Sequence, residues 1–193
     1  MGAESSGSAA SDLVVYLNAG ANQAAPPLAL MRREAESLMQ TAGYSIQWRD
    51  AQSRRTGVDA PNLVFVELSG ACIVPMSPVP GAPAPDDNQP SLATTAVEDG
   101  VVLPFSRIDC AALTRILSSV FAREAPGRRT YLYGRAMGRL LAHELYHVLA
   151  QTRDHVAAGI GKPCFTASDL VADRFEFESV ALARLQRPPS PSS

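Results

Sequence analysis

Two kinds of segment are missing from this 193-residue chain. No apolar run reaches the roughly 20 residues that a membrane-spanning helix needs, and no long run of Lys or Arg occurs among the 17 basic residues. With 19 acidic residues, the formal net charge is −2. These absences argue against a membrane span, and against nucleic acid or an anionic membrane as the main partner.

Cysteine is scarce, and its spacing is uninformative about metal binding. The three residues Cys72, Cys110 and Cys164 include no close CxxC pair of the kind found in structural zinc knuckles. An odd number fits a reduced cytosolic protein, or one disulfide beside a free thiol, and the sequence leaves both open.

A secretory signal is also missing from the start of the chain. Residues 1–8 are small and polar, without the charged start and apolar block of a signal peptide. We therefore expect a cytoplasmic protein from the sequence as written, or a secreted one if a precursor was trimmed.

The composition and the order of segments predict one α+β domain. We expect a disordered leader over residues 1–11, a domain over 12–186 and a disordered tail over 187–193. Within the domain, residues 74–93 are predicted to form a loop, because prolines that cannot join a strand ladder recur there. These are Pro75, Pro78, Pro80, Pro83, Pro85 and Pro90.

Apolar patterning predicts the regular elements. Runs rich in β-formers predict strands over 12–17, 44–48, 62–68 and 101–105, the last an edge strand because of Pro104. Helical spacing predicts helices from Pro26 to the stop at Gly43, over 109–121, and over about 130–151. In the last helix, Gly134 and Gly138 would allow a neighbour to approach closely. This order predicts a mixed sheet with packed helices.

The last long helix carries the residues that point to chemistry. His143 and His147 are four residues apart, so a helix places both on one face, where their imidazoles can bind one Zn²⁺. Glu144 lies beside them and could take a proton from a zinc-bound water that attacks a carbonyl group. Two histidines buried without a partner would be costly, and a metal offsets that cost. The pattern predicts a zinc site with Glu144 as general base.

The distribution of histidine predicts the third ligand. The chain has only three histidines, and His143, His147 and His155 lie within 13 consecutive residues. We therefore predict His155 as the third zinc ligand. Asp154 is the competing ligand, because a carboxylate oxygen also suits zinc.

With this motif in place, the chain resembles the zincin metallopeptidases, and among them the metzincins. That family carries HExxHxxGxxH on a helix beside a mixed sheet, and His143, Glu144 and His147 match its first ligand, base and second ligand. The family's glycine falls at Ala150 here, and His155 comes two residues later than the family's third histidine. A later histidine followed by Gly-Ile is similar to the pattern in a group of uncharacterised bacterial metzincin-like proteins. In another branch of the zincins, a glutamate on a second helix is the third ligand. Glu176 and Glu178, in a segment over 169–178 that could be helical, are therefore the next candidates if His155 does not bind.

The resemblance implies a zinc metallopeptidase, and more narrowly an endopeptidase, that hydrolyses peptide bonds of a peptide or protein substrate. It also implies that an extended substrate lies antiparallel to the edge strand, which we predict at 101–105. One alternative is a closed structural zinc site without protease activity, in which Cys164 is the fourth ligand. Another is a domain without metal whose histidines lie on a polar surface.

Overall fold

Five strands form one mixed sheet, in the spatial order β2-β1-β3-β5-β4. The computed structural model describes residues 10–20, 23–52, 61–74 and 91–187. Strands β2, β1, β3 and β5 run parallel to one another, whereas β4 runs antiparallel to its neighbour β5. Their bounds are Ser11–Asn18 for β1, Tyr44–Asp50 for β2, Leu63–Ser69 for β3, Ala93–Glu98 for β4 and Val101–Asp109 for β5.

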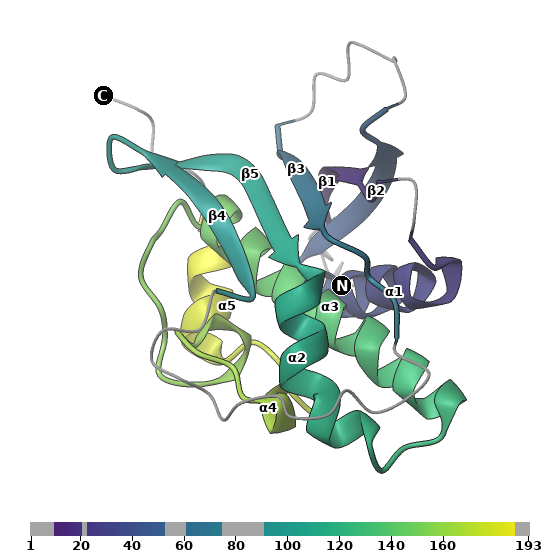
Figure 1. Ribbon diagram of the computed structural model, residues 1–193. Helices are drawn as coiled ribbons and strands as arrows, with labels where there is room; N and C mark the ends of the chain where they lie inside the picture. The colour runs from purple at the N-terminus through teal and green to yellow at the C-terminus, as the bar shows by residue number, and fades with distance from the viewer. Residues whose placement is uncertain (1–9, 21–22, 53–60, 75–90, 188–193) are drawn as a thin grey trace, which may run out of the picture.

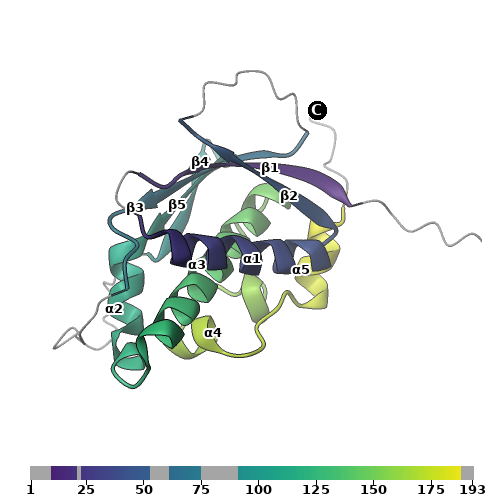
Figure 2. The same ribbon diagram turned by 90° about the vertical axis from the view of Figure 1, so that its right-hand side faces the viewer.

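The helices cover one face of this sheet, as the edge-on view in Figure 2 shows. They are α1 (Ala25–Thr41), α2 (Cys110–Phe121), α3 (Pro126–Leu149), α4 (Ala167–Val171) and α5 (Ser179–Leu185). Figure 1 shows α3 running beneath the strands, with α2, α4 and α5 around it. The predicted α+β architecture, a mixed sheet with packed helices, is confirmed. No helix in the described part of the chain is long and apolar enough to cross a membrane.

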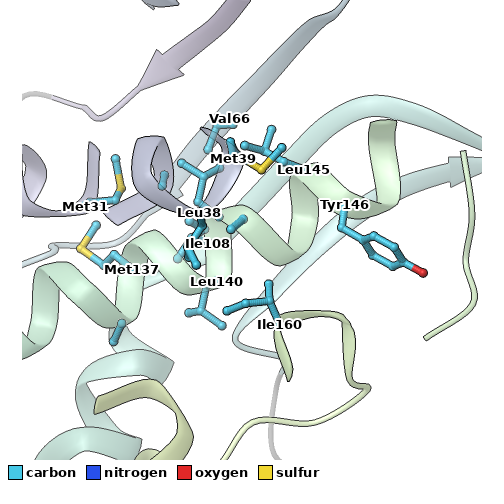
Figure 3. Packing of buried hydrophobic residues seen from close by; sticks show 14 of the residues in the cluster. Met31, Leu38, Met39, Val66, Ile108, Met137, Leu140, Leu145, Tyr146 and Ile160 are labelled. Atoms are coloured by element: carbon cyan, nitrogen blue, oxygen red, sulfur yellow. The ribbon is translucent and has the colours of Figure 1, made fainter. Parts of the chain in front are cut away.

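The core lies between the sheet and the pair formed by α1 and α3. Alternate residues of β1, Leu13 and Val15, are completely buried and belong to the same apolar cluster as Met31 of α1 and Met137 of α3. Figure 3 shows the two methionines side by side between their helices. A period of two in the strand and a helical period in α1 and α3 together produce this single core.

Two glycines let α3 approach α1 closely, as the sequence predicted. A Cβ placed on Gly138 would lie 2.6 Å from Glu34 Cβ, and one on Gly134 would collide with Leu30. Neither glycine has a positive φ, so close packing and not backbone freedom explains the residue type. The close contact holds the helix with the histidine motif firmly against the rest of the domain.

The prediction of the edge strand was wrong. Residues 101–105 belong to β5, which lies between β3 and β4 in the sheet, although its pairing with β3 begins only at Phe105. Pro104 is tolerated there because the β4–β5 register shifts between Thr95 and Val97, opposite the proline, and prolines inside sheets are found at such irregularities. The edge strand beside β5 is β4, which the sequence did not predict, and β2 forms the opposite edge.

Other predicted boundaries also change. Ser11 begins β1 because it pairs with Tyr44, so the expected leader 1–11 extends one residue too far; residues 1–9 lie outside the described part. Ala93 pairs with Ile108, which places the end of the expected 74–93 loop in β4, and residues 75–90 are outside the description. Of the expected tail 187–193, only Arg187 is described. Of the possible helix over 169–178, only residues 169–171 are helical, because α4 ends at Val171 and α5 begins at Ser179.

Candidate metal centre

Helix α3 places His143, Glu144 and His147 in the interior of the protein. The helix begins with Pro126 at an N-terminal position, where its missing N–H costs nothing, and is buried along most of its length after Leu132. His143 is 6% exposed, Glu144 3% and His147 7%. The alternative with histidines on a polar surface is therefore wrong for His143 and His147.

Backbone carbonyl groups orient both rings. His143 Nδ1 lies 2.6 Å from the carbonyl oxygen of Ile160, and His147 Nδ1 lies 2.8 Å from that of Thr152. A carbonyl oxygen can only accept, so each Nδ1 must carry the hydrogen and donate it. In the neutral rings, both Nε2 atoms then have a free lone pair, which is the tautomer that a metal ligand needs.

The two free Nε2 atoms face each other at 3.0 Å. Two lone pairs at this distance repel unless a cation lies between them, because neither nitrogen has a hydrogen to donate. Tetrahedral zinc with bonds of about 2.0–2.1 Å would separate two nitrogen ligands by about 3.3 Å. The donor set and its spacing therefore fit a zinc ion.

His155 completes this group from the segment that follows α3. Its ring centroid is 5.3 Å from that of His143 and 4.8 Å from that of His147, and the ligand atoms of the three histidines all lie within 4.8 Å of one another. His143 and His147 are buried, whereas His155 is exposed. The three predicted ligands are thus brought together in space.

The other predicted ligands lie outside this group. Among the described residues, the three histidines alone form a group of metal-ligating side chains. The carboxylates of Asp154, Glu176 and Glu178 do not belong to it, and Cys164 is an exposed free thiol outside it.

A tight turn carries the chain from α3 back to His155. The helix ends at Leu149, and Gln151 adopts a left-handed conformation with φ of 47°. The amide of Thr152 donates to the His147 carbonyl oxygen at 3.1 Å, while the Thr152 carbonyl oxygen accepts from the His147 ring. The turn thus positions the second histidine and redirects the chain toward the third.

The edge strand β4 holds Glu144. Thr95 Oγ1 donates to Glu144 Oε2 at 2.6 Å, and Ser106 Oγ of β5 lies 3.0 Å from Thr95 Oγ1. Because the Thr95 hydrogen goes to the carboxylate, Ser106 is the donor in the second bond. Glu144 Oε1 has no hydrogen-bond partner among the described residues. One oxygen is thus anchored, while the other can accept a proton.

Burial controls the protonation of these groups. Desolvation raises the pKa of Glu144 to about 7 against the opposing hydrogen bond from Thr95, which is a favourable range for a general base near neutral pH. Desolvation lowers the pKa of His143 to about 4 and also lowers the pKa of His147 and of His155. Neutral imidazoles are the form that binds a metal.

Several residues of the site could not be recognised in the sequence. The carbonyl groups of Thr152 and Ile160 carry no side-chain signature, and Thr95 lies in a strand that was not predicted. Tyr146, inside the histidine motif, is completely buried and directed away from the α1 side of the helix (Figure 3).

Comparisons of the chain with known protein families, with curated proteins and with solved structures found no match. The functional argument therefore starts from the three histidines, Glu144 and the strand beside them.

Proposed function

We propose that this chain is a zinc-dependent peptidase, with His143, His147 and His155 as ligands and Glu144 as general base. The observation that carries the proposal is the pair of Nε2 lone pairs facing each other at 3.0 Å, each oriented by a carbonyl group at the opposite ring nitrogen. The sequence resemblance to zincin metallopeptidases supports the same function.

Each residue has a distinct task in this proposal. Bound zinc would polarise a peptide carbonyl group and lower the pKa of a water molecule. The three imidazoles would hold the ion, and no fourth metal-ligating side chain of the described residues joins their group. Glu144 accepts the proton of the attacking water through Oε1 and delivers it to the departing amine, while Thr95 holds Oε2 in place.

The proposed substrate is an extended peptide that lies along β4. In the described part of the chain, β4 pairs with β5 alone, so its other edge has no strand partner. An added strand could form main-chain hydrogen bonds there. Thr95 of the same strand contacts Glu144, so a peptide bound along β4 would pass beside the base.

The closed structural zinc site is the alternative. It needs a fourth protein ligand, and Cys164 was the candidate in the sequence. Cys164 lies outside the histidine group in the structure, and this supports an open fourth position, which is typical of catalytic zinc.

Metal content tests the proposal first. Elemental mass spectrometry of the purified parent should find about one zinc per chain, and His155→Ala should lose most of it. Asp154→Asn is the matched control, since it alters the neighbouring competing ligand and should retain zinc.

A peptide-library assay then tests hydrolysis. Glu144→Gln should retain zinc but lose peptidase activity, because glutamine cannot take up a proton. A parent that binds no zinc after reconstitution contradicts the whole proposal. A zinc-loaded parent that cleaves no peptide, or a Glu144→Gln variant as active as the parent, contradicts the peptidase assignment.

A further inference from the structure

We propose that Tyr146 and Arg184 are positioning residues that hold His155 at the metal. This inference rests on the proposed zinc site and concerns how its third ligand is kept in reach. Arg184 lies on α5, 29 positions after His155 in the sequence.

His155 needs such support because its side chain forms no hydrogen bond with a described residue. Its side chain is exposed, and residues 153–156 form neither helix nor strand. By contrast, His143 and His147 are held by the buried helix α3 and by carbonyl groups at their Nδ1 atoms. A ligand on an irregular, exposed segment loses more conformational freedom when it binds a metal than one on a rigid helix.

The contacts of Tyr146 and Arg184 act on the residue before His155. The Tyr146 hydroxyl donates to the Asp154 carbonyl oxygen at 3.2 Å, and Arg184 Nη1 donates to the Tyr146 hydroxyl at 2.7 Å. Arg184 Nη1 also lies 3.5 Å from the same carbonyl oxygen. The guanidinium group of Arg184 thus polarises and orients the Tyr146 hydroxyl group. That hydroxyl group in turn holds the backbone at Asp154.

The backbone after His155 is fixed as well. The amide of Val156 donates to the Gly161 carbonyl oxygen at 2.9 Å. With the Asp154 carbonyl group held by Tyr146, both peptide units that flank His155 are anchored. The side chain of His155 therefore leaves the backbone from a defined point.

The position of Tyr146 in the motif explains how one helix can do both tasks. His147 follows it directly, and the two rings pack at a centroid distance of 5.3 Å. Tyr146 also packs against Phe177, at 6.4 Å. The helix thus supplies two ligands from one side and the support for the third ligand from the neighbouring side.

Charge makes the role of Arg184 testable. A guanidinium group repels a nearby dication, so removal of its charge alone should strengthen zinc binding. If Arg184 instead positions His155, its removal should weaken binding. The sign of the change therefore separates positioning from simple electrostatics.

The experiment measures zinc affinity of the full chain by competition with a chromophoric chelator. We expect Tyr146→Phe and Arg184→Ala each to raise the Kd for zinc about tenfold or more, as is typical when support of a metal ligand is lost. Arg187→Ala, at an exposed arginine two residues after the end of α5, should leave the Kd unchanged. Circular dichroism and thermal unfolding in chelator check that each variant is folded.

A double-mutant cycle identifies the residue through which they act. In a His155→Ala background, Tyr146→Phe and Arg184→Ala should have no further effect on the Kd. Equal weakening with and without His155, or wild-type affinity in both single variants, overturns the inference while the zinc site stands. A parent that binds no zinc overturns the proposed function and with it this role, which is a separate and recognisable result.

Discussion

The hydroxyl group of Thr95 donates a 2.6 Å hydrogen bond to the carboxylate of Glu144, across 49 positions of sequence. This bond joins the edge strand of the sheet to the helix that carries the histidine motif. Ser106 donates to the same hydroxyl group from β5, so two buried or partly buried hydroxyls in series hold one oxygen of the proposed base. The strand proposed to bind substrate thereby also orients the residue proposed to act on it.

Replacement of Thr95 by valine should slow peptide hydrolysis without loss of zinc. A hydrogen bond to a charged group contributes roughly 1.5–3 kcal/mol, so we expect kcat to fall about tenfold or more while KM changes little. Thr95→Ser retains a hydroxyl group and should recover most of the rate. Steady-state kinetics with zinc content checks this, and a Thr95→Val variant with parental kcat contradicts it.

Glu144 should make the metal-free protein less stable as the pH rises. Burial raises the pKa of this carboxyl from 4.5 to about 7, so the folded state holds the proton more tightly than the unfolded state. Its stabilising contribution is complete below the unfolded pKa and is lost as the pH rises through about 7.

Glu144→Gln removes this loss, because glutamine stays neutral. In the presence of chelator, we expect the variant to be more stable than the parent by on the order of 1–3 kcal/mol at pH 8, and by much less at pH 5. Urea unfolding at both values measures the difference. An advantage that is equal at the two pH values would count against a raised pKa for Glu144.

Gly138→Ala should destabilise the protein although alanine favours helices. The added Cβ would lie 2.6 Å from Glu34 Cβ and 2.8 Å from the Met31 carbonyl oxygen, and overpacking of this kind typically costs about 1–3 kcal/mol. Gly127→Ala is the matched control in the same helix, because its Cβ would meet no atom within 4 Å. The control should be neutral or stabilising by up to about 1 kcal/mol, as thermal unfolding of both variants can establish.

The disulfide between Cys72 and Cys110 should contribute to stability. It joins two completely buried residues 38 positions apart in sequence, one shortly after β3 and the other at the start of α2. Loss of a crosslink of this kind typically costs about 2–4 kcal/mol. Urea unfolding of Cys72→Ala/Cys110→Ala should show that loss, whereas Cys164→Ser, at the exposed free thiol, should unfold like the parent. Equal stability of all three proteins contradicts the prediction.

The sequence by itself determined the parts of the fold that depend on local periodicity. Helical spacing predicted α1, α2 and α3 within a few residues, and apolar runs predicted β1, β2 and β3. It also predicted which three histidines would meet, because His143 and His147 are one helical turn apart and His155 follows after a short turn. These relationships extend over about a dozen residues and need little knowledge of the rest of the chain.

Only the tertiary structure decided the relationships that join distant segments. The sequence left the cysteine pairing open, because the pairing depends on where β3 ends relative to α2. It assigned the edge to residues 101–105 because Pro104 cannot donate to a ladder, and could not predict the shift in register that accommodates the proline. Thr95 lies 49 positions from Glu144 in the sequence, and Arg184 lies 29 positions from His155. Ile160, whose carbonyl group orients His143, lies 17 positions from that histidine. Such contacts arise from packing of the whole domain, and no local pattern of residues encodes them.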